Sequence, residues 1–247
     1  MIDAMRFSSR TIGLASAVIT VLIWTGFIVI ARASASRGLL PLDIALARIL
    51  GASAVLLPWA WWLMRPARQR GEKTGSLLGL SPLPLTQTVR AGFFGGLLYA
   101  VLAYSGFFFA PAAHASVLLP GSLPLWTTLL AWFVLREKVS SARAMGLGFI
   151  VLGDLLVGGL SLLRAFEGGD VWKGDVMFMC AACSWAAYSV TVRRFGLDAV
   201  RATMAITAFA FVFFVPVYLV LIGLGILPTH LHQVPGSEIL FQAAFQG

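Results

Sequence analysis

Two ionisable side chains lie in stretches of sequence that are otherwise almost entirely apolar. Asp154 stands about eleven residues into the run from Ala144 to Leu163, and Arg48 lies near the start of the run from Ile44 to Met64. A bare carboxylate at the centre of a bilayer costs about 2.5–3.5 kcal/mol, so Asp154 must be paired, protonated or hydrated there. We therefore expect Asp154 to be either a proton-coupling carboxylate or a contact between helices.

Arg48 allows two interpretations. Its aliphatic stem can run along a helix until the guanidinium group reaches the outer membrane interface, in which case the residue is an anchor. Alternatively, a cation near the outer mouth of a transport path attracts the carboxylate or phosphate group of a solute.

Four aromatic residues are candidates for the lining of a solute path: Trp24, Tyr99, Trp185 and Tyr188. Trp185 and Tyr188 share one face of a helix at i, i+3 spacing. Such rings can stack on flat or apolar solutes, and each offers one hydrogen-bonding tip. The alternative is an interfacial belt, where Trp and Tyr are common, and we assign Trp59, Trp61 and Trp62 to such a belt.

Pro120 and Pro124 stand one helical turn apart in a further apolar run. Each proline removes a backbone hydrogen bond and bends a helix. The pair therefore predicts a bent helix, which could act as a gate beside a cavity or form a static kink.

Signatures of catalysis and of metal binding are absent from the sequence. It contains no Gly-x-Ser-x-Gly, no P-loop, no His-Glu-x-x-His and no paired carboxylates on one helix. Cys180 and Cys183 lack the further ligands that a zinc site needs, so we expect small core residues. We expect His114 to meet water or a backbone carbonyl. These observations favour a protein that is not an enzyme and holds no metal or cofactor.

The residues above stand on seven long apolar segments, each close to the 20 residues or so that cross a bilayer. The segments run from Thr11 to Ala31, Ile44 to Met64, Ala91 to Pro111, Ala112 to Leu135, Ala144 to Leu163, Val176 to Val192 and Ala202 to Leu227. Only helices, whose backbone hydrogen bonds close internally, suit that setting in a single chain of this pattern. The sequence predicts an all-α, polytopic membrane helix bundle.

Charge and composition agree with a membrane protein. Hydrophobic residues make up 59% of the chain and charged residues 11%, with a formal net charge of +8. Most Lys and Arg residues precede the first apolar segment or lie in the loops after the second, fourth and sixth. The positive-inside rule then places the N-terminus in the cytoplasm, and short basic loops of this kind argue against nucleic acid as a partner.

The segment 65–90 is rich in basic residues, glycine and proline. It predicts an exposed cytoplasmic linker that can also touch anionic membrane lipid, at about 1 kcal/mol per nearby cation. In the next apolar segment Gly92, Gly96 and Ala100 form a stripe of small residues that allows close helix packing.

An internal repeat emerges when the chain is shifted by 161 residues. Trp24 then aligns with Trp185, and Arg32 aligns with Arg193. The second copy begins five apolar segments after the first, and because five is an odd number it enters the membrane in the opposite direction. Inverted repeats of this kind are typical of transporters with a solute site near the midplane, between the halves.

Three groups of residues carry a resemblance to a known family: Ile23-Trp24-Thr25-Gly26 with Pro41 and Arg48; Ala115-Ser116-Val117-Leu118-Leu119 with Pro124, Leu135-Arg136-Glu137-Lys138, Gly146 and Gly153; and Gly174-Asp175 with Trp185 and Tyr188. Together they resemble the EamA-type branch of the drug/metabolite transporter superfamily. The resemblance implies ten helices in two inverted repeats, a central cavity lined by the first, third and sixth helices, and often an arginine at the position of Arg48. It also implies alternating-access transport of a small organic metabolite such as an amino acid, by export across the inner membrane.

On this pattern, residues 1–163 form the first five-helix repeat, which includes the linker 65–90. Residues 174–247 form part of the second repeat, and Leu240-Phe241-Gln242 stands at the start of its eighth helix. About seven and a half of the ten helices are then present, so we expect a chain truncated in the eighth. The alternatives are an inactive fragment or membrane scaffold and, from another class, an intramembrane enzyme.

Overall fold

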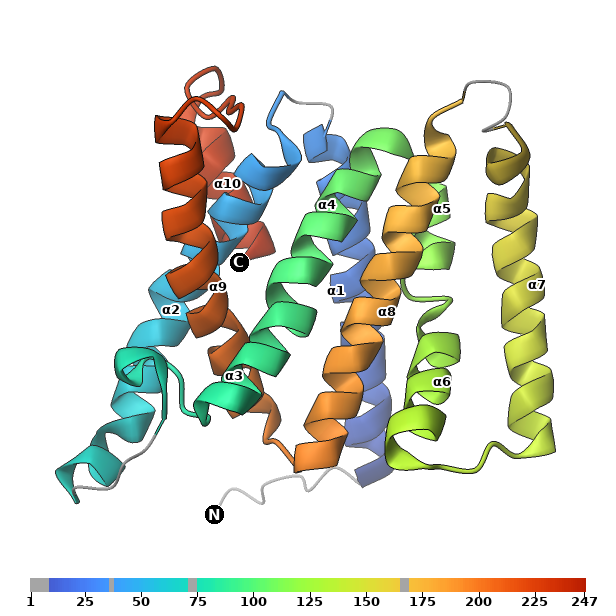
Figure 1. Cartoon of the computed structure of the whole chain (residues 1–247), viewed down its shortest axis with the longest axis horizontal. Coiled ribbons are helices and arrows are strands. Elements are labelled where there is room, and N and C mark those ends of the chain that lie inside the picture. The colour runs from blue at the N-terminus through green and yellow to red at the C-terminus, as the bar shows by residue number, and fades with distance from the viewer. Residues whose placement is uncertain (1–8, 36–37, 71–74, 165–168) are drawn as a thin grey trace, which may run out of the picture.

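In the computed structural model, which describes residues 9–35, 38–70, 75–164 and 169–247, the regular elements are all helices. Most of them stand side by side along one direction (Figure 1). Seven described stretches are long and apolar enough to cross a membrane: Gly13–Ser34, Pro41–Pro66, Leu85–Phe109, Ala112–Leu135, Ser141–Leu160, Val171–Phe195 and Ala199–Gly223. The predicted polytopic helix bundle is confirmed. Residues 1–8, whose Arg6 contributes to the predicted orientation, lie outside the described part.

The elements follow in the order α1 Ser9–Ala35, α2 Pro41–Gln69, the 3₁₀ turn η1 Leu77–Gly79, α3 Leu85–Ala91, the π-helix η2 Gly92–Leu98, α4 Tyr99–Phe109, α5 Ala112–Leu118, α6 Leu123–Leu135, α7 Ser141–Arg164, α8 Val171–Phe195, α9 Ala199–Gly223 and α10 Gly236–Gln246. Helices α3, η2 and α4 together make the third span, and α5 and α6 make the fourth. Helix α1 runs in the opposite direction to α8, and α2 in the opposite direction to α9 (Figure 1). The inverted-repeat hypothesis requires these two relations.

Glycines allow the central helices to approach closely. A Cβ atom added to Gly174 of α8 would lie 2.7 Å from the carbonyl oxygen of Gly106 in α4. Gly92 and Gly96 of the predicted small-residue stripe pack against α9, where a Cβ atom on Gly92 would lie 2.2 Å from Cβ of Phe209. Close backbone approach of this kind gives helices van der Waals contact where lipid removes the hydrophobic driving force.

A buried carboxylate joins the start of α2 to the connection between α9 and α10. Asp43 has no exposed surface. It accepts hydrogen bonds from the backbone N–H groups of Leu40 at 3.1 Å and His230 at 2.9 Å. The hydroxyls of Thr229, at 2.9 Å, and Tyr218 also donate to it. Because four donors share its two oxygens, this burial of a charge is well compensated.

The segment 65–90 is partly helical in the structure, and a few of its residues are buried. Helix α2 continues to Gln69 and α3 begins at Leu85. From residue 75 the chain turns back on itself, and Ser81 and Thr88 are fully buried with their hydroxyls 2.7 Å apart. The turn uses the positive φ of Gly75, and the buried hydroxyls satisfy one another, so polar composition did not mean exposure here.

The helix that contains Pro120 and Pro124 is interrupted and not simply bent. A turn at Leu119–Ser122 separates α5 from α6. Pro120 lies in that turn, because it has no N–H to continue α5. Pro124 lies in the first turn of α6, where a missing N–H leaves no hydrogen bond unmade. A gating role for this interruption stays a prediction.

The contact between α4 and α8 can be tested with one methyl group. Gly174→Ala should lower the midpoint of thermal unfolding in detergent, because the new Cβ would meet α4 backbone and overpacking costs about 1–3 kcal/mol. Gly153→Ala on α7 is the matched control: nothing lies within 4 Å of its added Cβ, and alanine favours a helix by about 1 kcal/mol over glycine. A Gly174→Ala protein as stable as the Gly153→Ala protein would contradict this packing.

Candidate solute-binding cavity

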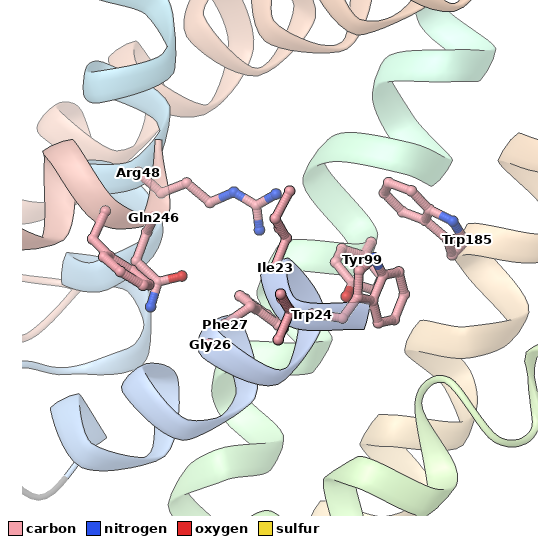
Figure 2. Close-up of a pocket in the computed structure, with 10 residues that line it drawn as sticks. Ile23, Trp24, Gly26, Phe27, Arg48, Tyr99, Trp185 and Gln246 are labelled. Carbon is pink, nitrogen blue, oxygen red and sulfur yellow. The ribbon is translucent and has the colours of Figure 1, made fainter. Parts of the chain in front are cut away.

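Two adjoining cavities lie inside the bundle. The larger, of about 360 Å³, lies between α1, α2, α4, α8 and α10, and Figure 2 shows it. The smaller, of about 230 Å³, lies between α2, η2, α8 and α9. Arg48 and Trp185 line both cavities. We call the two together the Arg48 cavities, because they meet at these two side chains.

The four aromatic residues predicted for a solute path are brought together around Trp185. Its ring centroid lies 6.1 Å from that of Trp24, 4.9 Å from that of Tyr99 and 5.1 Å from that of Tyr188. Trp24 contacts Trp185 edge to face, so the two tryptophans that align in the internal repeat touch each other. Contact of these rings with a solute stays a prediction.

Arg48 extends from α2 into the larger cavity, toward α1 (Figure 2). Its guanidinium carbon lies 5.7 Å from the centroid of the Phe27 ring, a cation–π distance. Its Nη1 atom is buried and makes no hydrogen bond to any described residue. The N–H groups of Nη1 are of the kind that suits a carboxylate. A role for Arg48 in attracting a solute stays a prediction.

Gln246 of α10 is a lining residue that the sequence did not single out. Its side chain is nine-tenths buried, and its Oε1 accepts a hydrogen bond from the Tyr104 hydroxyl at 3.2 Å. That bond leaves Nε2, which is buried and has no partner among the described residues. The larger cavity therefore presents two unpaired N–H donors, from Arg48 and Gln246. Gln246 lies beyond the seven apolar segments, so hydropathy gave no signal for it.

The remaining predicted site residues lie elsewhere. Asp154 is on α7 and lines a separate cavity against α5, α6 and α8. Pro120 and Pro124 are not among the described residues that line the Arg48 cavities.

The structure changes two smaller expectations. His114 pairs with a carboxylate, a partner that the sequence did not suggest: its Nδ1 lies 2.8 Å from Oδ1 of Asp175, at the start of α8. Both residues stand at the same end of their spans, which was the available signal for the pair. Cys180 is exposed on the surface of α8 and does not lie in the core. In the part of the chain that the structure describes, no three His, Cys, Asp or Glu side chains gather as a metal site would require.

Comparison with known proteins adds to this geometry. The model of the EamA-like transporter family matches residues 11–159, which is more than half of the chain. The chain belongs to the EamA-like transporter family. An "Uncharacterized transporter" from Archaeoglobus fulgidus is 26% identical over 200 residues, which are 80% of this chain and 64% of that protein. The "Uncharacterized transporter YyaM" of Bacillus subtilis is 26% identical over 105 residues, 41% of this chain and 34% of its own length.

The chain thus spans less than two thirds of the length of either curated relative. A solved structure described only as "Crystal structure of protein" aligns with 91% of this chain and 76% of its own, with a TM-score of 0.48 and 22% identity. Membership of the EamA-like transporter family and the seven spans identify a multi-pass membrane protein. The predicted family resemblance is confirmed.

A water-filled path can be tested on α2 with single cysteines. In a Cys180→Ser, Cys183→Ser background, Ala52→Cys should react with a membrane-impermeant thiol reagent, because Ala52 lines the smaller cavity. Val55→Cys is the control on the same helix: its side chain is 68% exposed on the outer surface of the bundle, where lipid excludes a charged reagent. Equal labelling of both, measured by gel shift, would contradict a hydrated cavity beside Arg48.

Proposed function

We propose that this EamA-family transporter is a secondary carrier for a small organic anion, such as an amino acid or another carboxylated metabolite. The solute binds in the Arg48 cavities and is exported across the inner membrane. The N-terminus is cytoplasmic in this proposal, which follows from the distribution of Lys and Arg over the loops. The outward direction follows from the family resemblance.

One observation carries the choice of an anion. The Nη1 atom of Arg48 and the Nε2 atom of Gln246 are buried, lack partners among the described residues, and belong to side chains that line one cavity. A buried donor without an acceptor loses about 1–3 kcal/mol relative to a satisfied one. A carboxylate offers two acceptor oxygens to such donors, and the rings of Trp24, Tyr99 and Trp185 can pack on the remainder of the solute.

Alternating access is supported by where the cavity lies. Its walls come from α1, α2 and α4 on one side and from α8 and α10 on the other, which belong to the two proposed repeats at 1–163 and 174–247. Trp24 and Trp185 meet across this boundary. In our proposal the two repeats rock about this contact, so that the solute faces one side of the membrane and then the other.

Arg48→Met tests the proposed solute class. Removing the cation should reduce efflux of carboxylated metabolites from expressing cells about tenfold or more, because hydrogen bonds to charged groups contribute about 1.5–3 kcal/mol. Arg48→Lys should be intermediate, since lysine keeps the charge but loses the planar fork of donors. Arg143→Met, at an exposed position near the start of α7, should transport as the wild type does.

The decisive comparison pairs each labelled acid with its uncharged amide. We expect efflux of acids to depend on Arg48 and efflux of amides to be low in every variant. Equal efflux of acids by the wild-type and Arg48→Met proteins, at equal expression, would refute the anion site.

Asp154 does not line the Arg48 cavities, so a proton on this carboxylate would act on transport without contact with the solute. In our proposal its protonation changes how α7 packs and thereby which way the carrier faces. Asp154→Asn should then make efflux insensitive to collapse of the pH gradient. Efflux that responds to neither the substitution nor the gradient would remove this hypothesis.

A further inference from the structure

A third cavity, of about 350 Å³, lies between α5, α6, α7 and α8 and is separate from the Arg48 cavities. We call it the α7 cavity. Helix α7 stands at the edge of the bundle (Figure 1). Only 6% of its most apolar membrane-spanning stretch is buried. The cavity walls are mainly apolar, with Leu118, Leu125, Val151 and Met179 among them. An apolar cavity of this size suits an organic body better than a chain of waters.

Two polar side chains in this cavity lack a partner among the described residues. Asp154 is nine-tenths buried although it lies on an otherwise exposed helix. Its Oδ2 atom has no hydrogen-bond partner within the described residues. Trp126, on the opposite wall in α6, likewise has a buried indole N–H without a described partner. A buried carboxylate oxygen without a donor is costly, so a ligand that brings a donor would be stabilised here.

The charges around the cavity select the sign of that ligand. A second carboxylate, Asp175 of α8, also lines it, and His114 of α5 holds Oδ1 of Asp175 at 2.8 Å. No Lys or Arg is found among the described lining residues. Two carboxylates in an otherwise mainly apolar wall favour a cation over an anion or a neutral molecule.

We propose that the α7 cavity is a second binding site, which takes a lipophilic amine. The protonated amine donates a hydrogen bond to Asp154, and the hydrocarbon body packs between α6, α7 and α8. Asp154 lies near the middle of α7, where the phosphate of an aminophospholipid would itself have to leave water. The ligand is therefore a free amine and not a lipid headgroup.

Such a ligand can enter from the bilayer. Val151, Leu155 and Val176 line the cavity, and their side chains are 39%, 57% and 43% exposed. Their exposed faces would contact lipid tails, so the cavity opens toward the membrane interior. Amines with a large apolar body concentrate in that region, which makes the route independent of the path through the Arg48 cavities.

The 247-residue protein in detergent micelles provides the test, with 1-adamantanamine as the probe and 1-adamantanol as its neutral counterpart. Isothermal titration calorimetry should show saturable binding of the amine. The alcohol should bind with an affinity at least about tenfold lower, which is the difference expected for one charge-assisted hydrogen bond. Asp154→Asn, which keeps the shape of the side chain, should weaken amine binding by a similar factor. Asp170→Asn, an exposed position paired with Lys173, should not.

Further variants separate this site from the proposed carrier function. Arg48→Met should leave amine binding unchanged. Gly158→Leu keeps both carboxylates but places a side chain in the cavity, where only ordinary contacts surround its Cβ position, and should block the amine even if Asp154→Asn fails to fold. Equal binding of amine and alcohol, or amine binding that survives Asp154→Asn, would overturn the proposal. So would an Asp154→Asn protein that loses only its response to a pH gradient, since Asp154 would then serve coupling alone.

Discussion

A guanidinium group inside an apolar helix bundle is the constraint on which the site depends. Burying a cation is costly unless nearby groups compensate for the lost water. Around Arg48 the compensation is partial: the Phe27 ring lies at a cation–π distance, and phenol groups of Tyr99 and Tyr104 are its electrostatic neighbours. One nitrogen is left without a described partner. Arg48 thus leaves one hydrogen-bond donor unpaired at the point where the two Arg48 cavities meet. In our proposal an anionic solute accepts that hydrogen bond.

The packing around that charge explains how it can be held there. Gly174 and Gly106 let α4 and α8 approach each other. The rings of Tyr99 and Trp185 then lie side by side, with their centroids 4.9 Å apart. At one end of the bundle Asp43 collects four donors from α9 and two loops. These two charges on α2 therefore contrast: Asp43 is saturated and joins elements, whereas Arg48, less than two turns further along, is incompletely paired. A saturated charge stabilises the fold, and an incompletely paired one is available to a ligand.

The sequence predicted the seven spans and the family, because hydropathy and the spacing of special residues depend on local chain order. It did not predict Gln246 or the pairing of His114 with Asp175, since these contacts join segments far apart in the chain. The burial of Ser81 and Thr88 within the segment 65–90 was missed for a related reason: their hydroxyls satisfy each other only after the chain turns back. Composition shows that a segment is polar, but it does not show which polar groups will form hydrogen bonds with one another.

The central claim is that Arg48 binds the anionic group of the solute, and solid-state NMR in lipid bilayers tests it most directly. The protein would be labelled with ¹⁵N at arginine and mixed with a ¹³C-carboxylate solute selected by the efflux screen. The account predicts a dipolar contact between the carboxylate carbon and a single guanidinium group, which disappears in the Arg48→Met protein. A contact that persists in that variant, or one that involves only arginines in the loops, would contradict the account.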